Sequence, residues 1–534
     1  MDGNMKLRIG MSAGAVLLML VGLQAPARAA TPADTIVMAK SLDDMLGLDP
    51  AQVSEPTDIE VAANCYDRVM HFEPGDLTKL VGDTVESWTV SDDGKTFTFK
   101  VRPGQKFHSG NPLTAGDIAF SLQRVVILNK APSFLLTQLG WNADNVKQLV
   151  QAVDPSTVRL TIVHDYAPSL VLSLLGSIVA SVVDEKEVMA HAVDGDLGNA
   201  WLKTHDAGSG PFMLRAWTPD ESVVLEAYPG YRLGAPRIKH VILRHTPEAA
   251  VQQLLLEKGD VDIARDLTAD QIASLAGNPG IAITQHPSGF IWYMALNVKD
   301  DRLANPKVRE ALRYLVDYQG MARTFLKGQL MVHQAFWPSG FSDSLEDNPF
   351  SLNVAEARKL LAEAGYPNGF DIRMDTGDTW PFTEIAQSIQ QSMALAGIRL
   401  DIQQHDYRQV LTISRSRQHQ IALMHWAQDY MDPHSNASAF AYNPDNSDDS
   451  KTKNLAWRSS WYDPAVNAET EAALHQRDAA KRRQMYLDLQ RRLQADSPFI
   501  VLFQSTIEVA ARRDVKGFVV GPAWDLVAYR LMSK

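Results

Sequence analysis

Cysteine is almost absent from this chain of 534 residues, which contains only Cys65. A single thiol cannot form an internal disulfide, so the fold must be stabilised by its apolar core. Hydrophobic residues make up 45% of the sequence and charged residues 21%, as is typical of a globular protein with a sizeable core. The length indicates two or three domains.

Long apolar runs are also missing, except near the amino terminus. Lys6 and Arg8 precede an uncharged run over Ile9–Leu23, and Ala27-Arg28-Ala29 has the form of a cleavage site. This pattern predicts a secretory signal peptide over residues 1–29. No cysteine lies near the cleavage site to carry a lipid anchor, and no other run is long enough to cross a bilayer. We therefore expect an exported protein without a lipid anchor.

Positive charge is in deficit, since 51 Lys and Arg residues face 63 Asp and Glu residues and the formal net charge is −12. Residues 1–29 contain one acid and three bases, so their removal would leave a net charge of −14. An acidic exported protein is a poor candidate for binding nucleic acid or an anionic membrane. The basic run Lys481-Arg482-Arg483 lies in a helical pattern and is typical of a solvated helix face.

Catalytic and metal-binding motifs are missing as well. There is no His-Glu-x-x-His sequence, and Gly94-Lys95-Thr96 resembles the end of a P-loop but has Thr89 in place of the first glycine. Gly208-Ser209-Gly210 lacks the spacing of a nucleophile elbow. No cluster with metal-ligand spacing accompanies the histidines. We therefore predict no catalytic residue, no cofactor and no metal ligand.

Strand and helix patterns are mixed along the chain, which favours an α/β or α+β fold. Thr96–Val101 alternates with period two after the turn signal Asp92-Asp93-Gly94, and Thr114–Asp117 is a capping box that opens a helix. Asn305-Pro306 opens another helix. Further strands are expected at 31–40, 158–162, 212–217, 222–228, 240–245, 399–404, 499–509 and 517–520, and further helices at 59–70, 247–258, 353–364, 384–396 and twice within 464–495.

The stretch His425–Pro433 is the candidate ligand site. It follows the short apolar run Ile421–Met424, which is typical of a buried strand. Trp426 offers a flat apolar wall, Asp429 a carboxylate, and Asp432-Pro433 a turn. These features suit a partly enclosed cation such as an α-ammonium group. They are equally compatible with two turn-forming aspartates and a core tryptophan.

Several longer phrases resemble one family. The first block consists of Glu86–Trp88, Ser91–Phe99, Arg102–Gly110 and Pro112–Asp117. Gly208–Phe212, Gly259–Asp262, Asn297 with Val308–Leu312, and Ala357–Tyr366 follow in order. Together they are similar to the extracytoplasmic solute-binding proteins of ABC transporters, in the dipeptide/oligopeptide/nickel-binding family (family 5). The resemblance covers essentially the whole chain after the predicted signal peptide.

This resemblance implies an α/β, two-lobed periplasmic binding protein fold of type II-like form, with an extra inserted domain and a ligand cleft between the lobes. Lobe I would comprise residues 30–75, 200–292 and 503–534, the inserted domain 76–199, and lobe II 293–502. The implied protein is a monomeric periplasmic receptor that captures a small peptide or peptide-like solute. It would deliver that solute to the transmembrane subunits of an ABC permease and would not be an enzyme.

The resemblance also implies site residues. Asp429 matches the carboxylate that holds a peptide's α-ammonium group, and Trp426 matches the adjacent pocket tryptophan. His425 and Ala427 would lend backbone groups to an extended ligand, as an added strand does. The remaining expected contacts are Tyr430 beside Asp429, Ser54 and Glu55 in a loop of the first lobe, and Trp292 and Tyr293, which are equally compatible with core packing.

Two arginines of the family pattern are missing. Asp375–Phe382 lacks the arginine with which dipeptide binders clamp the ligand carboxylate, and Leu423 stands near the place of a second one in oligopeptide binders. Arg408, Arg415 or Arg417 could substitute, but each is equally compatible with a position on the surface. Peptides, amino-acid conjugates such as opines, and oligosaccharides therefore stay open as ligands. A third hypothesis, an exported hydrolase, rests on the nearby carboxylates Asp429 and Asp432.

Overall fold

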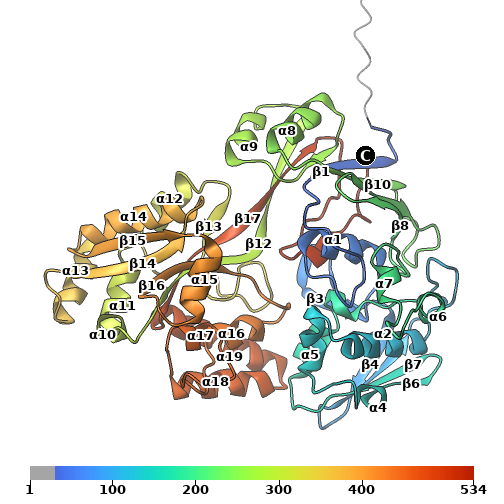
Figure 1. Ribbon diagram of the computed structural model, residues 1–534, viewed down its shortest axis with the longest axis horizontal. Coiled ribbons are helices and arrows are strands. Elements are labelled where there is room, and N and C mark those ends of the chain that lie inside the picture. Colours follow the sequence, from blue (N-terminus) through green and yellow to red (C-terminus); the bar gives the residue numbers. More distant parts are fainter. Residues whose placement is uncertain (1–30) are drawn as a thin grey trace, which may run out of the picture.

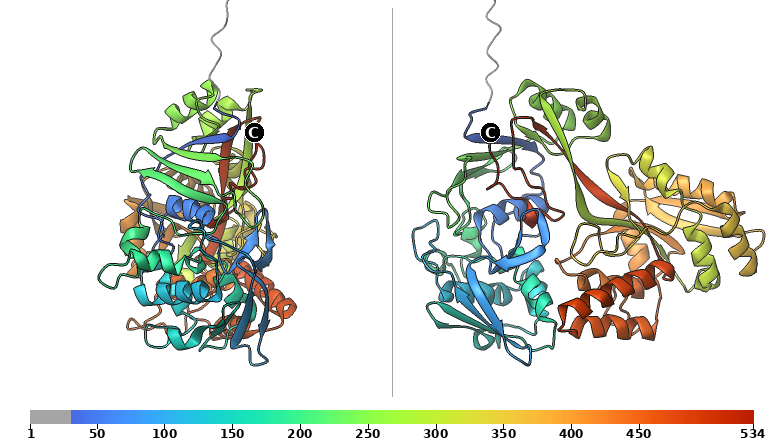
Figure 2. Two further views of the ribbon diagram at one scale, coloured as in Figure 1. Left: turned by 90° about the vertical axis from the view of Figure 1, so that its right-hand side faces the viewer. Right: turned by 180° about the vertical axis from the view of Figure 1, so that it is seen from behind.

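Two long antiparallel strands join the two halves of the molecule. The computed structural model describes residues 31–534, so the predicted signal peptide lies outside the described part. Strands β12 (Ile281–Leu296) and β17 (Phe499–Arg512) pair along most of their length and run from one half into the other (Figure 1). Figure 2 shows the same crossing from behind. We call the half that contains β1 lobe I and the half that contains β14 lobe II.

A single sheet of 11 strands passes through both lobes in the order β15-β14-β16-β12-β17-β11-β1-β10-β9-β8, with β13 also paired to β17. In lobe I, β1 is parallel to β10 and β11, and β10, β9 and β8 are antiparallel. The lobe I elements are β1 (Thr35–Lys40), α1 (Pro56–Cys65), β8 (Phe212–Thr218), β9 (Ser222–Ala227), β10 (His240–His245), α8 (Ala249–Lys258), β11 (Ile263–Ala264) and α9 (Ala269–Leu275).

A separate four-stranded antiparallel sheet, in the order β4-β5-β7-β6, lies beneath lobe I in Figure 1. We call this sheet and the elements around it the smaller sheet unit. Strands β2 and β3 pair as a hairpin beside the sheet. The elements of the unit are β2 (Met70–Glu73), β3 (Asp76–Gly82), β4 (Val85–Val90), β5 (Thr96–Val101), α2 (Ala115–Leu128), α3 (Phe134–Thr137), α4 (Val146–Leu149), β6 (Val150–Asp154), β7 (Thr157–Thr161), α5 (Pro168–Leu174), α6 (Glu185–Ala190) and α7 (Asn199–Leu202). The capping box predicted at Thr114 and Asp117 is confirmed at the start of α2. Phe97 and Phe99 of β5 belong to the same apolar core as Ile36 of β1, so this unit is packed continuously onto lobe I.

Lobe II buries both faces of its part of the large sheet. β12 alternates: Trp292 and Met294 face one core, whereas Tyr293 and Ala295 face another. Strand β14 is parallel to both β15 and β16, so the carboxyl ends of these three strands meet at one edge. The lobe II elements are α10 (Asp301–Ala304), α11 (Pro306–Arg313), α12 (Tyr318–Arg323), β13 (Leu330–Val332), α13 (Val354–Glu363), β14 (Asp371–Gly377), α14 (Phe382–Ala394), β15 (Arg399–His405), α15 (Tyr407–Arg415), β16 (Ile421–Trp426), α16 (His434–Phe440), α17 (Leu455–Arg458), α18 (Pro464–His475) and α19 (Ala479–Ala495).

Most predicted elements are confirmed, and two differ. The helix expected at 59–70 begins earlier, because Pro56 occupies its first turn, and ends at Cys65, where Tyr66 turns to an extended conformation. The strand expected at 517–520 forms only isolated bridges, such as Val519 to Ala528. None of the helices between residues 31 and 534 combines the length and the apolar character needed to cross a bilayer.

A buried ion network fastens four segments of lobe I to one another. Glu60 of α1 accepts hydrogen bonds from Lys40 Nζ at 3.0 Å, Arg265 Nη1 at 2.7 Å and the Tyr529 hydroxyl at 2.6 Å. Burial alone would raise the pKa of Glu60, but the two cations and the hydroxyl outweigh burial and lower it to about 2. The ionised form of Glu60 therefore stabilises the fold.

We predict that this network makes the protein sensitive to acid. Because the pKa of Glu60 is lower in the folded than in the unfolded chain, its contribution is present above about pH 4.5 and is lost as the pH falls toward about 2. The loss amounts to about 3 kcal/mol of unfolding free energy. Urea unfolding of the wild type and of Glu60→Gln at pH 3 and pH 6 measures it. If the unfolding free energy changes by the same amount between pH 3 and pH 6 in both proteins, Glu60 is not the responsible group.

Candidate functional site

A cavity of about 470 Å³ lies between the two lobes. Its wall combines the loop before α1, the segments 131–135 and 173–178 of the smaller sheet unit, the strand junction at Gly289 and Phe290, the loop 427–431 that follows β16, and the segment 522–525. The smaller sheet unit also touches lobe II directly, because Arg477 contacts Asp165 at 2.8 Å and Ser173 Oγ donates to the Met431 carbonyl at 2.7 Å. Every main part of the molecule therefore contributes to this site.

The loop after β16 is held by one buried ion pair. Both carboxylate oxygens of Asp432 accept from Arg482 of α19, at 2.7 and 2.8 Å, and Asp432 also accepts from the His434 amide at the start of α16. Burial would raise the pKa of Asp432, but Arg482 outweighs burial and lowers it. The expectation that Lys481-Arg482-Arg483 forms a solvated face is thus wrong for Arg482, which is 3% exposed. Its partner lies 50 residues away in sequence, beyond the reach of local pattern analysis.

Asp429 has the opposite environment. Its amide donates to Ser435 Oγ at 2.8 Å, which fixes the backbone, and its side chain lines the cavity. Among residues 31–534 no hydrogen bond or ion pair to the Asp429 carboxylate is found. Although solvent reaches this carboxylate, the surrounding protein removes part of its hydration and raises its pKa. It is a partly desolvated anion without a partner.

The other expected site residues fall into two groups. Ala427, Tyr430 and Ser54 line the cavity together with Asp429. Glu55 precedes the first turn of α1 and does not line the cavity. His425 and Trp426 lie at the end of β16 just outside the lining, with the His425 ring 4.7 Å from Tyr407 and Trp426 Nε1 donating to Asn436 at 3.1 Å.

Trp292 and Tyr293 pack into the two cores of lobe II. Trp292 Nε1 donates to Ser505 Oγ at 2.8 Å, and the Tyr293 hydroxyl lies 3.9 Å from Met424 Sδ. Tyr293 is fully buried, so its side chain is not available to a solute in the cavity. Both side chains belong to buried apolar clusters of lobe II, Trp292 to one and Tyr293 to the other.

Several cavity residues escaped sequence reasoning. Gln428 lies beside Asp429, packs so closely on Gly289 that a Cβ there would come within 2.2 Å of its Oε1, and leaves that oxygen buried without a partner. Phe290 and Phe134 reach the wall from the strand junction and from the smaller sheet unit. Gln428 could have been found from its place next to Asp429. No sequence signal marks Phe134, because its position depends on the packing of one domain against another.

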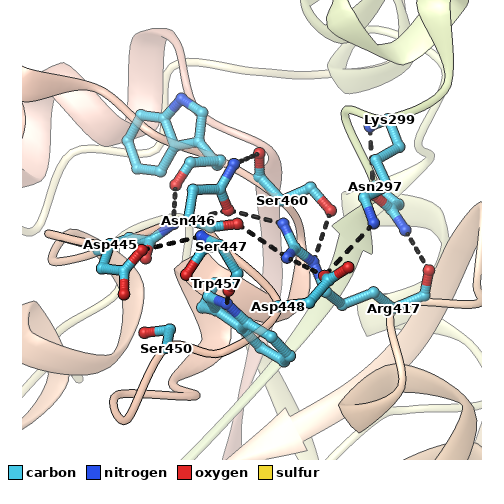
Figure 3. Close-up of polar contacts among 12 residues, drawn as sticks. Asn297, Lys299, Arg417, Asp445, Asn446, Ser447, Asp448, Ser450, Trp457 and Ser460 are labelled. Carbon is cyan, nitrogen blue, oxygen red and sulfur yellow. Dashed lines mark hydrogen bonds and ion pairs between the residues drawn. The ribbon is translucent and has the colours of Figure 1, made fainter.

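None of the three candidate substitutes for the missing arginines lines the cavity. Arg417 is buried and bound to Ser460 Oγ at 3.0 Å, to the Asn446 carbonyl at 3.0 Å and to Asp448 at 3.1 Å, while its guanidinium lies 4.5 Å from the Trp457 ring (Figure 3). It therefore fastens the polar loop around Asn446. Arg408 and Arg415 are exposed on α15. In the described part of the chain, no group of three or more His, Cys, Asp and Glu residues is arranged to hold a metal ion.

Comparison with known proteins identifies the family. A family model described as bacterial extracellular solute-binding proteins, family 5 Middle, matches residues 79–448. The chain belongs to this family. The resemblance found in the sequence is thereby confirmed.

Relatives match this family 5 protein over almost its whole length. The "Probable D,D-dipeptide-binding periplasmic protein DdpA" of Escherichia coli (strain K12) is 28% identical over 511 residues, 94% of each chain. HbpA2 from Haemophilus parasuis superposes with a TM-score of 0.81 at 24% identity, covering 93% of this chain and 99% of that one. The binding protein MoaA of A. tumefaciens R10, solved with mannopinic acid, gives a TM-score of 0.68 at 22% identity, covering 93% and 99%. The predicted two-lobed α/β fold is confirmed.

We predict that the two aspartates of this loop differ in their effect on stability. Arg482→Met leaves Asp432 buried without its partner and should lower the unfolding free energy by roughly 3–5 kcal/mol. Asp429→Asn removes a carboxylate that has no partner to lose, and should change the unfolding free energy by no more than about 0.5 kcal/mol. Urea denaturation of the solute-free proteins compares them. Similar losses in both variants would mean that Asp429 has a structural partner.

Proposed function

We propose that this protein is the periplasmic solute-binding component of an ABC importer, and that it captures a small peptide or peptide-like solute by its α-ammonium group. The observation that carries the proposal is the unpartnered, partly desolvated Asp429 carboxylate on the wall of a cavity between two lobes. An ammonium group there would form a charge-assisted hydrogen bond worth about 1.5–3 kcal/mol. Membership of the family supports delivery of the bound solute to permease transmembrane subunits.

The proposed working cycle is closure of the lobes over the solute. Residues 30–75, 200–292 and 503–534 would move with the inserted unit 76–199, because the two share one apolar core, while 293–502 would move as the second body. The β12–β17 pairing is irregular between Pro287 and Ile291, which is a suitable hinge. Closure removes water from the ammonium–carboxylate pair and strengthens it.

Further expectations complete the proposal. Residues 1–29 would be removed on export, leaving a monomer in the periplasm without a lipid anchor. We propose binding without catalysis, because Asp432, the second carboxylate that a hydrolase would need, is held on both oxygens by Arg482. The expected partners are the solute and the permease.

An opine or an oligosaccharide is the second candidate ligand. A structural neighbour solved with mannopinic acid favours testing it. Thermal-shift measurements against peptides, opines and oligosaccharides separate the candidates, since a solute at 100 times its Kd stabilises the folded state by about 2.7 kcal/mol.

We predict that Asp429→Ala weakens binding of an amine-bearing peptide by about tenfold or more, because the ammonium loses its counter-charge. Isothermal titration calorimetry measures the change, with Asp449→Asn on an exposed loop as the matched control. Burial raises the pKa of Asp429, so wild-type affinity should fall as the pH drops toward that pKa, since only the ionised carboxylate binds the ammonium. Unchanged affinity in Asp429→Ala would exclude this carboxylate as the contact.

We also predict that a bound solute favours the closed arrangement in solution. Small-angle scattering should show a smaller radius of gyration with solute than without it. Arg477→Ala, which removes the contact from lobe II to Asp165, should enlarge the solute-free form. Identical profiles with and without every solute that raises the melting temperature would contradict closure.

A further inference from the structure

The cavity between the lobes contains acidic groups and no basic ones. Its charged lining residues are Asp429 and Asp525, and no Lys, Arg or His side chain belongs to the lining in the described part of the chain. Asp525 already accepts from Arg68 Nη1 at 2.9 Å, so its charge is compensated. Asp429 is the remaining charge of the lining, and residues 31–534 supply no partner for its carboxylate. A solute carboxylate placed here would find no counter-charge and would lie near an anion, which costs free energy in a partly desolvated site.

Three uncharged polar groups of the wall, on Ser173, Ser177 and Gln428, bear on what the rest of the solute must offer. Ser173 Oγ donates to the Met431 carbonyl and Ser177 Oγ to the Leu174 carbonyl, so both hydroxyl protons are engaged. Gln428 Oε1 is buried and has no hydrogen-bond partner within residues 31–534. A buried carbonyl oxygen of this kind requires a donor. An N–H or O–H group of the solute, and not a carboxylate, is its complement.

An aromatic strip extends the wall beyond the cavity on lobe II. Phe290, which lines the cavity, lies edge-on to the His425 ring at 5.6 Å, and His425 stacks on Tyr407 at 4.7 Å. All three rings are half-buried, so part of each remains exposed to solvent. Burial lowers the pKa of His425 to about 4, which leaves the imidazole uncharged at neutral pH. The three rings themselves therefore add apolar contact and carry no positive charge at neutral pH.

From this arrangement we infer that the solute joins a free amine to an uncharged, hydrogen-bond-donating remainder with an apolar or aromatic side, as in a peptide amide, and lacks a free carboxylate within the cavity. This rests on the proposed function for the amine end, at Asp429, and goes beyond it for the other end. The amine would meet Asp429, an amide N–H would meet Gln428 Oε1, and the side chain would lie along Phe290, His425 and Tyr407. The absence of the family's clamping arginines then reflects the kind of solute bound.

Four chemical forms of each of two peptides test the two ends separately. The probes are Phe-Phe with a free or acetylated amino terminus, each as the free acid and as the carboxyl-terminal amide, and the same four forms of Ala-Phe. Titration calorimetry at pH 7 should show each free-amine amide binding about tenfold or more tightly than the matching acid. Equal or tighter binding of the acids overturns the inference, and so does a lack of binding by both amides. If acetylation does not weaken the amides while their preference over the acids persists, the proposed ammonium contact is wrong, and only the part of the inference that concerns the uncharged end of the solute stands.

Two variants locate the effect in the cavity wall. Gln428→Leu should reduce the preference for the amide over the acid to less than about threefold, because the unpaired oxygen is gone. Arg458→Gln is the control: Arg458 lies near Tyr407, donates to the Lys453 carbonyl and does not line the cavity. Acid binding that disappears in Arg458→Gln would identify a carboxylate clamp and overturn the inference. Mass spectrometry of solute released from the purified protein is a further test. A released solute with a free carboxylate would also contradict the inference.

Discussion

The pairing of β12 with β17 is the constraint on which the rest of the molecule depends. These two strands place the lobes on one continuous sheet, and each residue of the ladder fixes the distance and orientation of one lobe relative to the other. The register of the ladder shifts between Pro287 and Ile291 and again between Trp292 and Tyr293, and within the first of these shifts the Gly289 amide donates to the Pro522 carbonyl. The same shift brings Gly289 and Phe290 into the cavity wall. The same backbone segment therefore connects the two lobes and lines the cavity.

Two aspartates three positions apart show how the fold separates structural from functional charge. Asp432 is buried and held on both oxygens by Arg482, which positions the loop and the start of α16. Asp429 is held only through its backbone, by Ser435, and its carboxylate projects into the cavity without a partner. The Asp432–Arg482 pair and the Ser435 contact thus hold the loop at both positions, while the Asp429 side chain lines the cavity. Because Asp429 forms no ion pair in the empty protein, the favourable free energy of such a pair contributes in full to the binding of a cationic solute.

Local sequence patterns predicted the elements well and the contacts between distant segments poorly. The capping box at Thr114 and the apolar run at Ile421–Met424 are local signals, and the structure bears them out. The alternation of β12 could not be assigned in the same way, because both faces of that strand are buried and Trp292 and Tyr293 each fit either role. Arg482 and Arg417 resembled surface residues, since their partners lie 50 and 29–43 residues away. Such contacts are set by tertiary packing, which no local period reports.

The charge distribution of the site links these observations to specificity. A carboxylate clamp would need a cation on lobe II, but Arg417 is committed to Ser460 and the loop at Asn446, so moving it would leave that loop without its anchor. The wall offers instead one carboxylate and one amide oxygen for which residues 31–534 supply no partner, and the aromatic strip lies beside it. A site of this composition selects the two ends of a solute by two different interactions. Counter-charge selects the amine, whereas the lack of a cation and the unsatisfied Gln428 oxygen disfavour an anion at the other end, because a specific site rejects a group that leaves its buried polar atoms unpaired.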